Sequence, residues 1–217
     1  MQKRGQRGRL TRERIVAAAL AVADRDSLDA LTIRSVAAFV GAPPMSLYTH
    51  VSSKEELLNL MHCEVSRLIY EGEQQPTWQS ELLSLCLRTR RTLLEHPRWL
   101  PLCLRRYAPI PTLPARDRLL SLMTSDGMSL QEAFRTLMSV MTTAVAHAMV
   151  QVETEGPDSE PVLTTRIEQT RKRLAGVSEE ALTSTEKAVL NLRGFDVDEA
   201  FELTARALIA GIRTPYK

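Results

Sequence analysis

The sequence has few aromatic residues, few cysteines and no long apolar segment, and each shortage excludes a class of protein. Of its 217 residues, 5% are aromatic, 44% are hydrophobic and 25% are charged, a balance that excludes a largely disordered chain. The three cysteines, Cys63, Cys86 and Cys103, form no C-x-x-C pair, which argues against a disulfide framework or a zinc knuckle and favours a reducing compartment. No apolar run approaches the ~18 residues of a membrane span, so we expect a cytoplasmic protein.

The sequence also lacks the short motifs of common enzymes and metal sites. It contains no Gly-rich phosphate loop, no G-x-S-x-G and no evident acid/base pair, so we expect a protein without enzymatic activity. His62, Cys63 and Glu64 are potential ligands, but adjacent helical positions point in different directions and cannot converge on one metal ion. We therefore expect no metal and no other cofactor.

Charge is distributed unevenly along the chain. Residues 1–54 carry nine Lys and Arg against four Asp and Glu, a net charge of +5, whereas the remaining residues carry a net charge of −3. This asymmetry predicts that the first quarter of the chain binds an anion and that the rest does not.

Hydrophobic residues recur at the helical period throughout, and no segment alternates as a strand would. Ser53 with Glu56, and Ser129 with Glu132, are expected capping boxes at helix starts. Leu57, Met61, Val65 and Leu68 are expected on one apolar face. Pro97 is expected to end the helix before it, while Pro109, Pro111 and Pro114 predict an irregular connection. The expected helices cover residues 11–24, 33–40, 44–50, 54–70, 78–95, 113–125, 130–152, 167–174, 183–192 and 197–212.

Two short helices joined by a glycine–proline corner predict a helix-turn-helix. Thr32 caps the first helix, Gly41 ends it, and Pro44 suits the first turn of the second. The second helix carries small polar groups and an aromatic ring, Ser46, Tyr48, Thr49 and His50, while Leu47 and Val51 are expected to anchor it inward. Arg34 and Lys54 flank it as phosphate-binding cations.

The spacing alone leaves DNA binding and a purely structural bundle both open. Tyr48 is either a core aromatic or a DNA contact, and His50 is either a cap or a phosphate ligand. The arginines of the N-terminal arm, Arg4, Arg7 and Arg9, form either a solvated tail or a minor-groove arm.

At these residues the sequence resembles the DNA-binding domain of the tetracycline-repressor (TetR) family. The similar stretches are Leu31-Thr-Ile-Arg-Ser-Val-Ala, Gly41-Ala-Pro-Pro-Met-Ser-Leu-Tyr-Thr-His-Val51 and Lys54-Glu-Glu-Leu-Leu58. The resemblance implies an all-α homodimeric repressor whose paired recognition helices enter the major grooves of a palindromic double-stranded operator. It also implies DNA contacts from Arg34, Pro44, Ser46, Tyr48, Thr49, His50 and Lys54.

The resemblance continues more weakly toward the subgroup of the tetracycline repressor, at Trp78-Gln79, residues 90–97, Gly127-Met-Ser-Leu and residues 200–212. It implies a four-helix dimer core from residues 129–152 and 197–212, and release from DNA by a small-molecule effector. The expected organisation is a basic arm and helix-turn-helix domain in residues 1–54, a connecting helix and boundary in 55–75, and an effector-binding and dimerisation domain in 76–217. The alternative is a helical interaction module without DNA function.

The resemblance also implies a ligand pocket, which departs from that of the tetracycline repressor. Its lining would be Tyr70, Leu85, Thr89, Cys103, Tyr107, Met138 and Thr142. Thr142 and Val150 stand where that repressor has a metal-ligand His and a Glu, and Val150 offers a divalent cation no donor atom. We therefore expect a largely apolar effector rather than magnesium with tetracycline.

Overall fold

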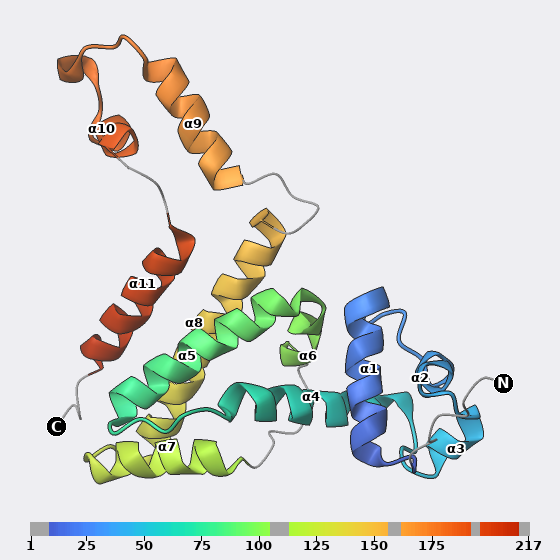
Figure 1. Cartoon of the computed structure of the whole chain (residues 1–217). Helices are drawn as coiled ribbons and strands as arrows, with labels where there is room; N and C mark the ends of the chain where they lie inside the picture. The colour runs from blue at the N-terminus through green and yellow to red at the C-terminus, as the bar shows by residue number, and fades with distance from the viewer. Residues whose placement is uncertain (1–8, 105–112, 156–161, 192–195, 213–217) are drawn as a thin grey trace. The chain divides into compact units, whose positions relative to one another are not determined.

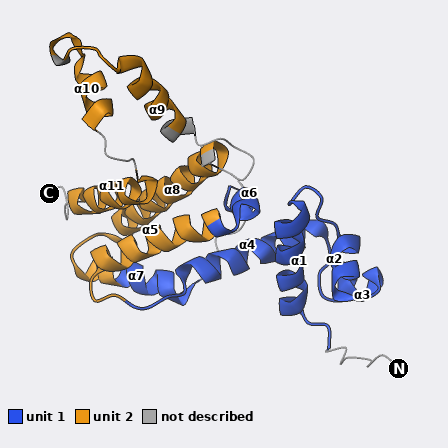
Figure 2. Cartoon of the chain, turned by 45° about the horizontal axis from the view of Figure 1, so that its top comes forward, with its two compact units in different colours: residues 1–74, 95–121 blue, residues 75–94, 122–217 orange. Residues whose placement is uncertain are grey.

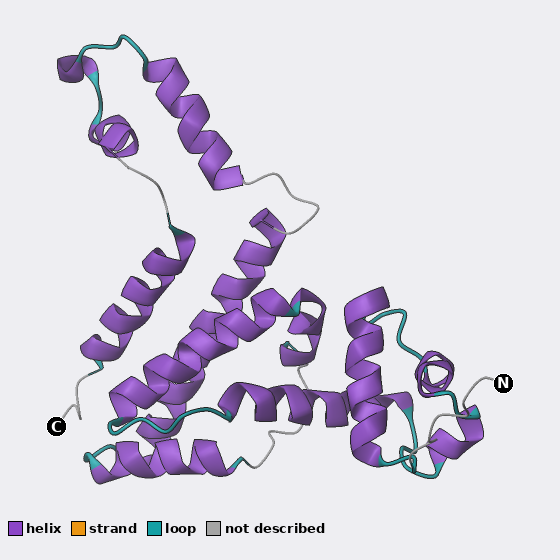
Figure 3. Ribbon diagram, viewed as in Figure 1, coloured by secondary structure: helices purple, strands orange, loops and turns teal. Residues whose placement is uncertain are grey.

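The chain is built from helices, and the computed structural model contains no strand among the residues that it describes, which are 9–104, 113–155, 162–191 and 196–212 (Figure 3). The expected all-helical class is therefore confirmed. In chain order the helices are α1 (Arg12–Asp26), α2 (Ile33–Val40), α3 (Pro44–Tyr48), α4 (Lys54–Tyr70), α5 (Trp78–Glu95), α6 (Leu100–Cys103), α7 (Pro114–Ser125), α8 (Leu130–Glu155), α9 (Val162–Leu174), α10 (Ser184–Asn191) and α11 (Val197–Gly211), with 3-10 turns η1 (Pro97–Trp99) and η2 (Glu179–Ala181) (Figure 1).

The helices group into two compact units (Figure 2). Unit 1 comprises residues 1–74 and 95–121, and unit 2 comprises residues 75–94 and 122–217. The chain therefore returns to unit 1 after α5, so that η1, α6 and most of α7 share a compact body with α1 to α4.

In unit 1, α1 packs against both α2 and α4 (Figure 1). Its apolar face buries Ile15, Ala19 and Val22 completely, and the hydroxyl of Thr11 caps its first turn by accepting from the amide of Arg14 at 3.3 Å. Burial of this face removes apolar area from water and holds the small bundle together.

Helix α2 is defined at both ends by side-chain and backbone chemistry. Thr32 and Ser35 form a reciprocal capping box, in which the Ser35 amide donates to the Thr32 hydroxyl and the Thr32 amide donates to Ser35 Oγ. Gly41 ends the helix in the left-handed conformation with φ 69°, which glycine adopts without a steric penalty. The sequence pattern predicted the Thr32 cap and the glycine stop, and both are confirmed.

The segment from Pro97 to Cys103 is helical, although the sequence predicted no helix there, and the irregular connection predicted at Pro109 and Pro111 lies outside the described residues. Pro97 and Pro101 each occupy a first-turn position, in η1 and α6 respectively, where the missing amide proton costs nothing. Trp99 and Leu102 are buried, so apolar packing stabilises two turns that are too short to show a period. Pro114 likewise opens α7 rather than interrupting it.

Two expectations for α4 differ from the structure. Leu68 is 39% exposed, and Ile69 takes its place on the buried face with Leu57, Met61 and Val65. At the helix start the Ser53 hydroxyl accepts from the Glu56 amide at 3.0 Å as expected, but the Glu56 carboxylate binds Ser52 instead of completing the box.

In unit 2, α8 lies against α11, and side chains join α5 to α8. The expected capping box at Ser129 and Glu132 is confirmed by reciprocal hydrogen bonds. Thr183 and Glu186 form a second reciprocal box at the start of α10. Helices α9 and α10 contact each other as a hairpin, and α9 also contacts α8 (Figure 1). The core of this unit includes Trp78, Leu82, Leu93, Leu137 and Phe201.

Candidate functional site

Helix α3 is a single short turn attached to unit 1 through one buried side chain, Leu47, which is 0% exposed. The next inward residue, Val51, is 1% exposed, so both expected anchors are confirmed. The helix ends at Tyr48 rather than His50, because the Leu47 carbonyl accepts from the amides of both His50 and Val51 at 2.9 Å. This double acceptance turns the chain toward α4.

The residues predicted to contact DNA lie mostly on the outer side of α3 and its following turn. Pro44 and Thr49 are exposed, Tyr48 is 48% exposed, and Ser46 and His50 are half-buried. Tyr48 is therefore not a core residue of unit 1. The Thr49 hydroxyl donates to the Ser46 carbonyl at 2.7 Å.

Arg12 fixes the turn between α3 and α4 from the start of α1. Its Nε and Nη2 donate to the His50 carbonyl at 3.1 and 3.0 Å, and Nη2 lies 3.4 Å from Glu56 Oε1. The other carboxylate oxygen of Glu56 accepts from the Ser52 amide at 2.7 Å. These Ser52 hydrogen bonds, with the charge of Arg12, lower the pKa of Glu56, so the network stays charged at neutral pH.

Two exposed cations flank α3. Arg34 lies in the first turn of α2, and Lys54 is the first residue of α4. Neither is paired with an acidic side chain in the described part of the chain. Exposed Arg9 and Arg14 add positive charge nearby in sequence, whereas the remaining arm residues, including Arg4 and Arg7, lie outside the described residues. A surface of exposed cations beside a helix whose outer side is exposed can bind a polyanion.

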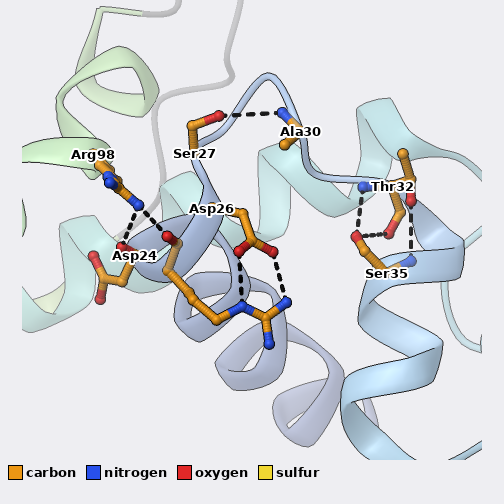
Figure 4. Close-up of polar contacts among 8 residues, drawn as sticks. Asp24, Asp26, Ser27, Ala30, Thr32, Ser35 and Arg98 are labelled. Carbon is orange, nitrogen blue, oxygen red and sulfur yellow. Dashed lines mark hydrogen bonds and ion pairs between the residues drawn. The ribbon is translucent and has the colours of Figure 1, made fainter.

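Two side chains that follow α5, His96 and Arg98, bind the carboxyl end of α1. Figure 4 shows the contact of Arg98. Arg98 Nη1 donates to the Asp24 carbonyl at 2.9 Å and also to the Arg25 carbonyl. His96 Nδ1 lies 2.8 Å from the Asp24 carboxylate, and its ring stacks on Trp99 with centroids 3.8 Å apart. A cation at the last carbonyls of a helix is electrostatically favourable. The sequence offered no signal for this contact, because its partners are more than 70 residues apart.

The contacts of His96 and Arg98 lie next to a strained joint between α1 and α2. Ser27 has φ 123°, a conformation that residues with a side chain adopt rarely. Its amide donates to the Ala23 carbonyl at 3.0 Å, and its hydroxyl accepts from the Ala30 amide at 3.3 Å (Figure 4). Such conformations persist where the surrounding contacts hold them.

The residues predicted to line a pocket are distributed over both units. Leu85 and Thr89 are buried on α5, and the Thr89 hydroxyl lies 3.7 Å from the sulfur of Met141 on α8. Met138 and Thr142 are exposed on α8. Met141, which the sequence left outside the pocket, is therefore the α8 residue that contacts Thr89.

The other three predicted pocket residues belong to the middle of the chain. Tyr70 and Cys103 lie in unit 1, and Tyr107 lies outside the described residues. Burial raises the pKa of Tyr70 to about 12 and that of the Cys103 thiol to about 11, so both side chains are neutral at physiological pH. A thiol held protonated is a poor nucleophile, which disfavours Cys103 as a redox sensor.

A buried cation ties three helices of unit 2 together. Arg90 on α5 is 7% exposed and donates to Gln151 on α8 and to Asp198 on α11. Its guanidinium also lies 5.0 Å from the centroid of the Phe201 ring, a cation–π distance. The sequence gave no local signal for this cluster, because its partners are 61 and 108 residues from Arg90.

Among the helices of the described residues, none combines the length and the apolar composition that spanning a bilayer needs. No group of three or more His, Cys, Asp or Glu side chains there is placed to hold a metal ion.

Comparison with known proteins gives consistent similarities. The family model described as "Tetracyclin repressor-like, C-terminal domain" matches residues 71–216. An HTH-type transcriptional regulator of Saccharopolyspora erythraea is 35% identical over 89 residues, which are 41% of this chain and 38% of that protein. The chain thus spans well under half of that relative's length. The class D tetracycline repressor protein of Escherichia coli is 28% identical over 219 residues, covering 94% of this chain and 95% of that protein.

Solved structures share the fold. The TetR family protein ActR of Streptomyces coelicolor, in complex with (S)-DNPA, is 25% identical and superposes with a TM-score of 0.69, over 93% of this chain and 96% of that chain.

Proposed function

Because the chain belongs to the tetracycline-repressor (TetR) family of transcriptional regulators, we propose that it is a cytoplasmic homodimeric repressor of transcription. Each protomer places one α3 in a palindromic operator, and a small-molecule effector releases the DNA. The observation that carries the proposal is the exposed outer side of α3, with Tyr48 48% exposed, between the unpaired cations Arg34 and Lys54.

The parts of the chain take distinct roles in this proposal. Residues 1–54 bind DNA, residues 55–75 connect, and residues 76–217 bind the effector and dimerise. Arg34 and Lys54 hold phosphates, while Pro44, Ser46, Tyr48, Thr49 and His50 face the major groove. Phosphate contacts set the register of a protein on DNA, and groove contacts read its sequence.

The proposed base contacts can be separated from the phosphate contacts by mutation. Lys54→Ala is expected to weaken binding to all DNA sequences alike, whereas Tyr48→Phe and Thr49→Ala are expected to change sequence preference as well, each by about 1–3 kcal/mol. The measurement is selection of bound DNA from a random pool by the full chain, followed by footprinting and titration of each variant.

Lys187→Ala, on α10 of unit 2, is the matched control for Lys54→Ala and is expected to leave DNA binding unchanged. If Tyr48→Phe and Thr49→Ala leave the footprint unchanged in strength and pattern, α3 is not the recognition helix. Binding without any sequence preference would favour the alternative of a helical interaction module.

The proposed dimer interface uses α8 and α11, which contact each other within the protomer. Exposed residues recur every three or four positions along α8 and include Met138, Met149 and Val150, and α11 exposes Leu203 and Leu208. Large apolar side chains are costly to leave in water. A second copy of the chain would cover those of both helices as a four-helix core, with Met138 and Met149 in packing roles.

The proposed effector is largely apolar and binds within unit 2, where Leu85 and Thr89 are buried on α5 and Thr89 lies against Met141 of α8. ActR has been solved with the small molecules (S)-DNPA and actinorhodin, which supports an organic effector here. The contacts of His96 and Arg98 with α1 would connect effector binding to the DNA-binding helices, because these two residues follow directly after α5. By linkage, an effector that weakens DNA binding must itself bind less tightly to the DNA complex.

A panel of apolar and aromatic compounds tests the effector chemistry by thermal shift of the full chain. A ligand at ~100 times its Kd stabilises the folded state by about 2.7 kcal/mol, so a true effector is expected to raise Tm by roughly 5–11 °C. Magnesium with tetracycline is expected to give no such shift, because Val150 offers no metal-binding atom. A large shift with magnesium and tetracycline would contradict the proposed pocket.

A further inference from the structure

The outer side of α3 offers little hydrogen-bonding chemistry to a base. Residues 44–50, all of them described, contain no Arg, Lys, Asn or Gln. Those are the side chains that recognise guanine or adenine through two hydrogen bonds in the major groove. Arg34 has such a side chain, but it lies on α2 and is assigned to a phosphate.

One of the available hydroxyl groups is also already engaged. Thr49 Oγ1 donates its proton to the Ser46 carbonyl at 2.7 Å. Its methyl group and oxygen lone pairs remain for a ligand, and Ser46 itself is half-buried. The Tyr48 hydroxyl is therefore the main hydrogen-bond donor on this side of the helix.

Met45 is the most prominent side chain on α3. It is 74% exposed, the largest value among the exposed large hydrophobic side chains of the described residues. Met45, Tyr48 and Thr49 are three and four positions apart and so share a helix face, opposite the buried Leu47. This face therefore carries the flexible thioether of Met45 near the start of the helix and the methyl group of Thr49 just after its end.

We propose that Met45 determines operator specificity by packing on the 5-methyl group of a thymine in each half-site. The inference rests on the proposed DNA-binding function and extends it to one chemical feature of the operator. The thymine methyl is the apolar group that the base edges present in the major groove. A polarisable, unbranched methionine adapts well to such a small group.

The experiment starts from DNA sequences that the full chain selects in vitro. Each thymine of both half-sites is replaced in turn by deoxyuridine, which removes only the 5-methyl group, and Kd is measured at fixed salt. At one symmetric position the wild-type protein is expected to lose affinity about fourfold per half-site, the effect of one buried methyl group. Replacement in both half-sites is then expected to cost about 15-fold.

The variant Met45→Ala is expected to bind the thymine and deoxyuridine operators equally. At the same position, 5-methylcytosine paired with guanine is expected to bind the wild-type protein more tightly than cytosine does, and Met45→Ala is expected to abolish that difference. Because Met45 is 74% exposed, its truncation is expected to leave the thermal unfolding of the protein unchanged.

Thr49→Ser is the control, since it removes the other exposed methyl group and keeps the hydroxyl bonded to the Ser46 carbonyl. If Thr49→Ser rather than Met45→Ala removes the sensitivity to deoxyuridine, the assignment to Met45 is overturned. It is overturned equally if no single thymine methyl affects binding, or if Met45→Ala remains as sensitive as the wild type. A chain that selects no DNA would refute the proposed function, and this inference with it.

Discussion

Operator affinity is expected to fall about a thousandfold when monovalent salt rises from about 50 mM to about 200 mM. Each Lys or Arg that neutralises a phosphate releases condensed counterions, so log Kd varies linearly with log salt. Arg34, Lys54 and the exposed Arg9 just before α1 supply about three such contacts per protomer, or roughly six per dimer, which gives a slope near 5.

The slope, rather than the affinity at one salt concentration, is the measurement. Lys54→Ala is expected to reduce it by about two, one contact from each protomer. Met45→Ala serves as the control, because it lowers affinity without removing a charge and should leave the slope unchanged. A flat dependence on salt would contradict a phosphate-bound complex and would leave the helical interaction module as the better interpretation.

The local structure was largely predictable from the sequence because its signals are local. Periodic apolar residues located the helices, and the glycine–proline corner at residues 41–44 separated α2 from α3. The outward side of α3 followed from the same spacing, since Leu47 and Val51 had to point inward. Where the signal was incomplete, the prediction was incomplete or wrong: Ser35, which is neither Glu nor Gln, completes the confirmed Thr32 cap without having been predicted, and Glu56 binds Ser52 rather than Ser53.

The contacts that join distant segments were not predictable in this way. Residues 95–121 belong to unit 1, where Trp99 and Leu102 are buried. The spacing of apolar residues in this segment does not predict that burial. The contacts of Arg98 with the carbonyls of α1, and those of Arg90 in unit 2, each join residues more than 60 positions apart. A side chain that serves a partner so distant has the same sequence signature as a solvated arginine.

Replacing Leu47 by alanine is expected to detach α3 and to abolish specific DNA binding. Leu47 is the only buried residue of this five-residue helix, and no side chain caps the helix start. A fully buried leucine truncated to alanine costs about 2–5 kcal/mol through lost transfer energy and the cavity left behind. A single helical turn has no other stabilising free energy of that size, because isolated short helices are unstable in water. Local stability therefore falls most in residues 41–51.

Amide hydrogen exchange of the full chain measures this loss segment by segment. In Leu47→Ala the amides of His50 and Val51, which donate to the Leu47 carbonyl, are expected to exchange at least tenfold faster, while α5 and α8 in unit 2 keep their protection. Met45→Ala, two positions away and outward, is the matched control and should exchange as the wild type does. If Leu47→Ala retains sequence-specific binding with normal protection at His50 and Val51, then α3 is held by contacts other than its buried leucine, and the orientation of its outer face toward DNA must have another cause.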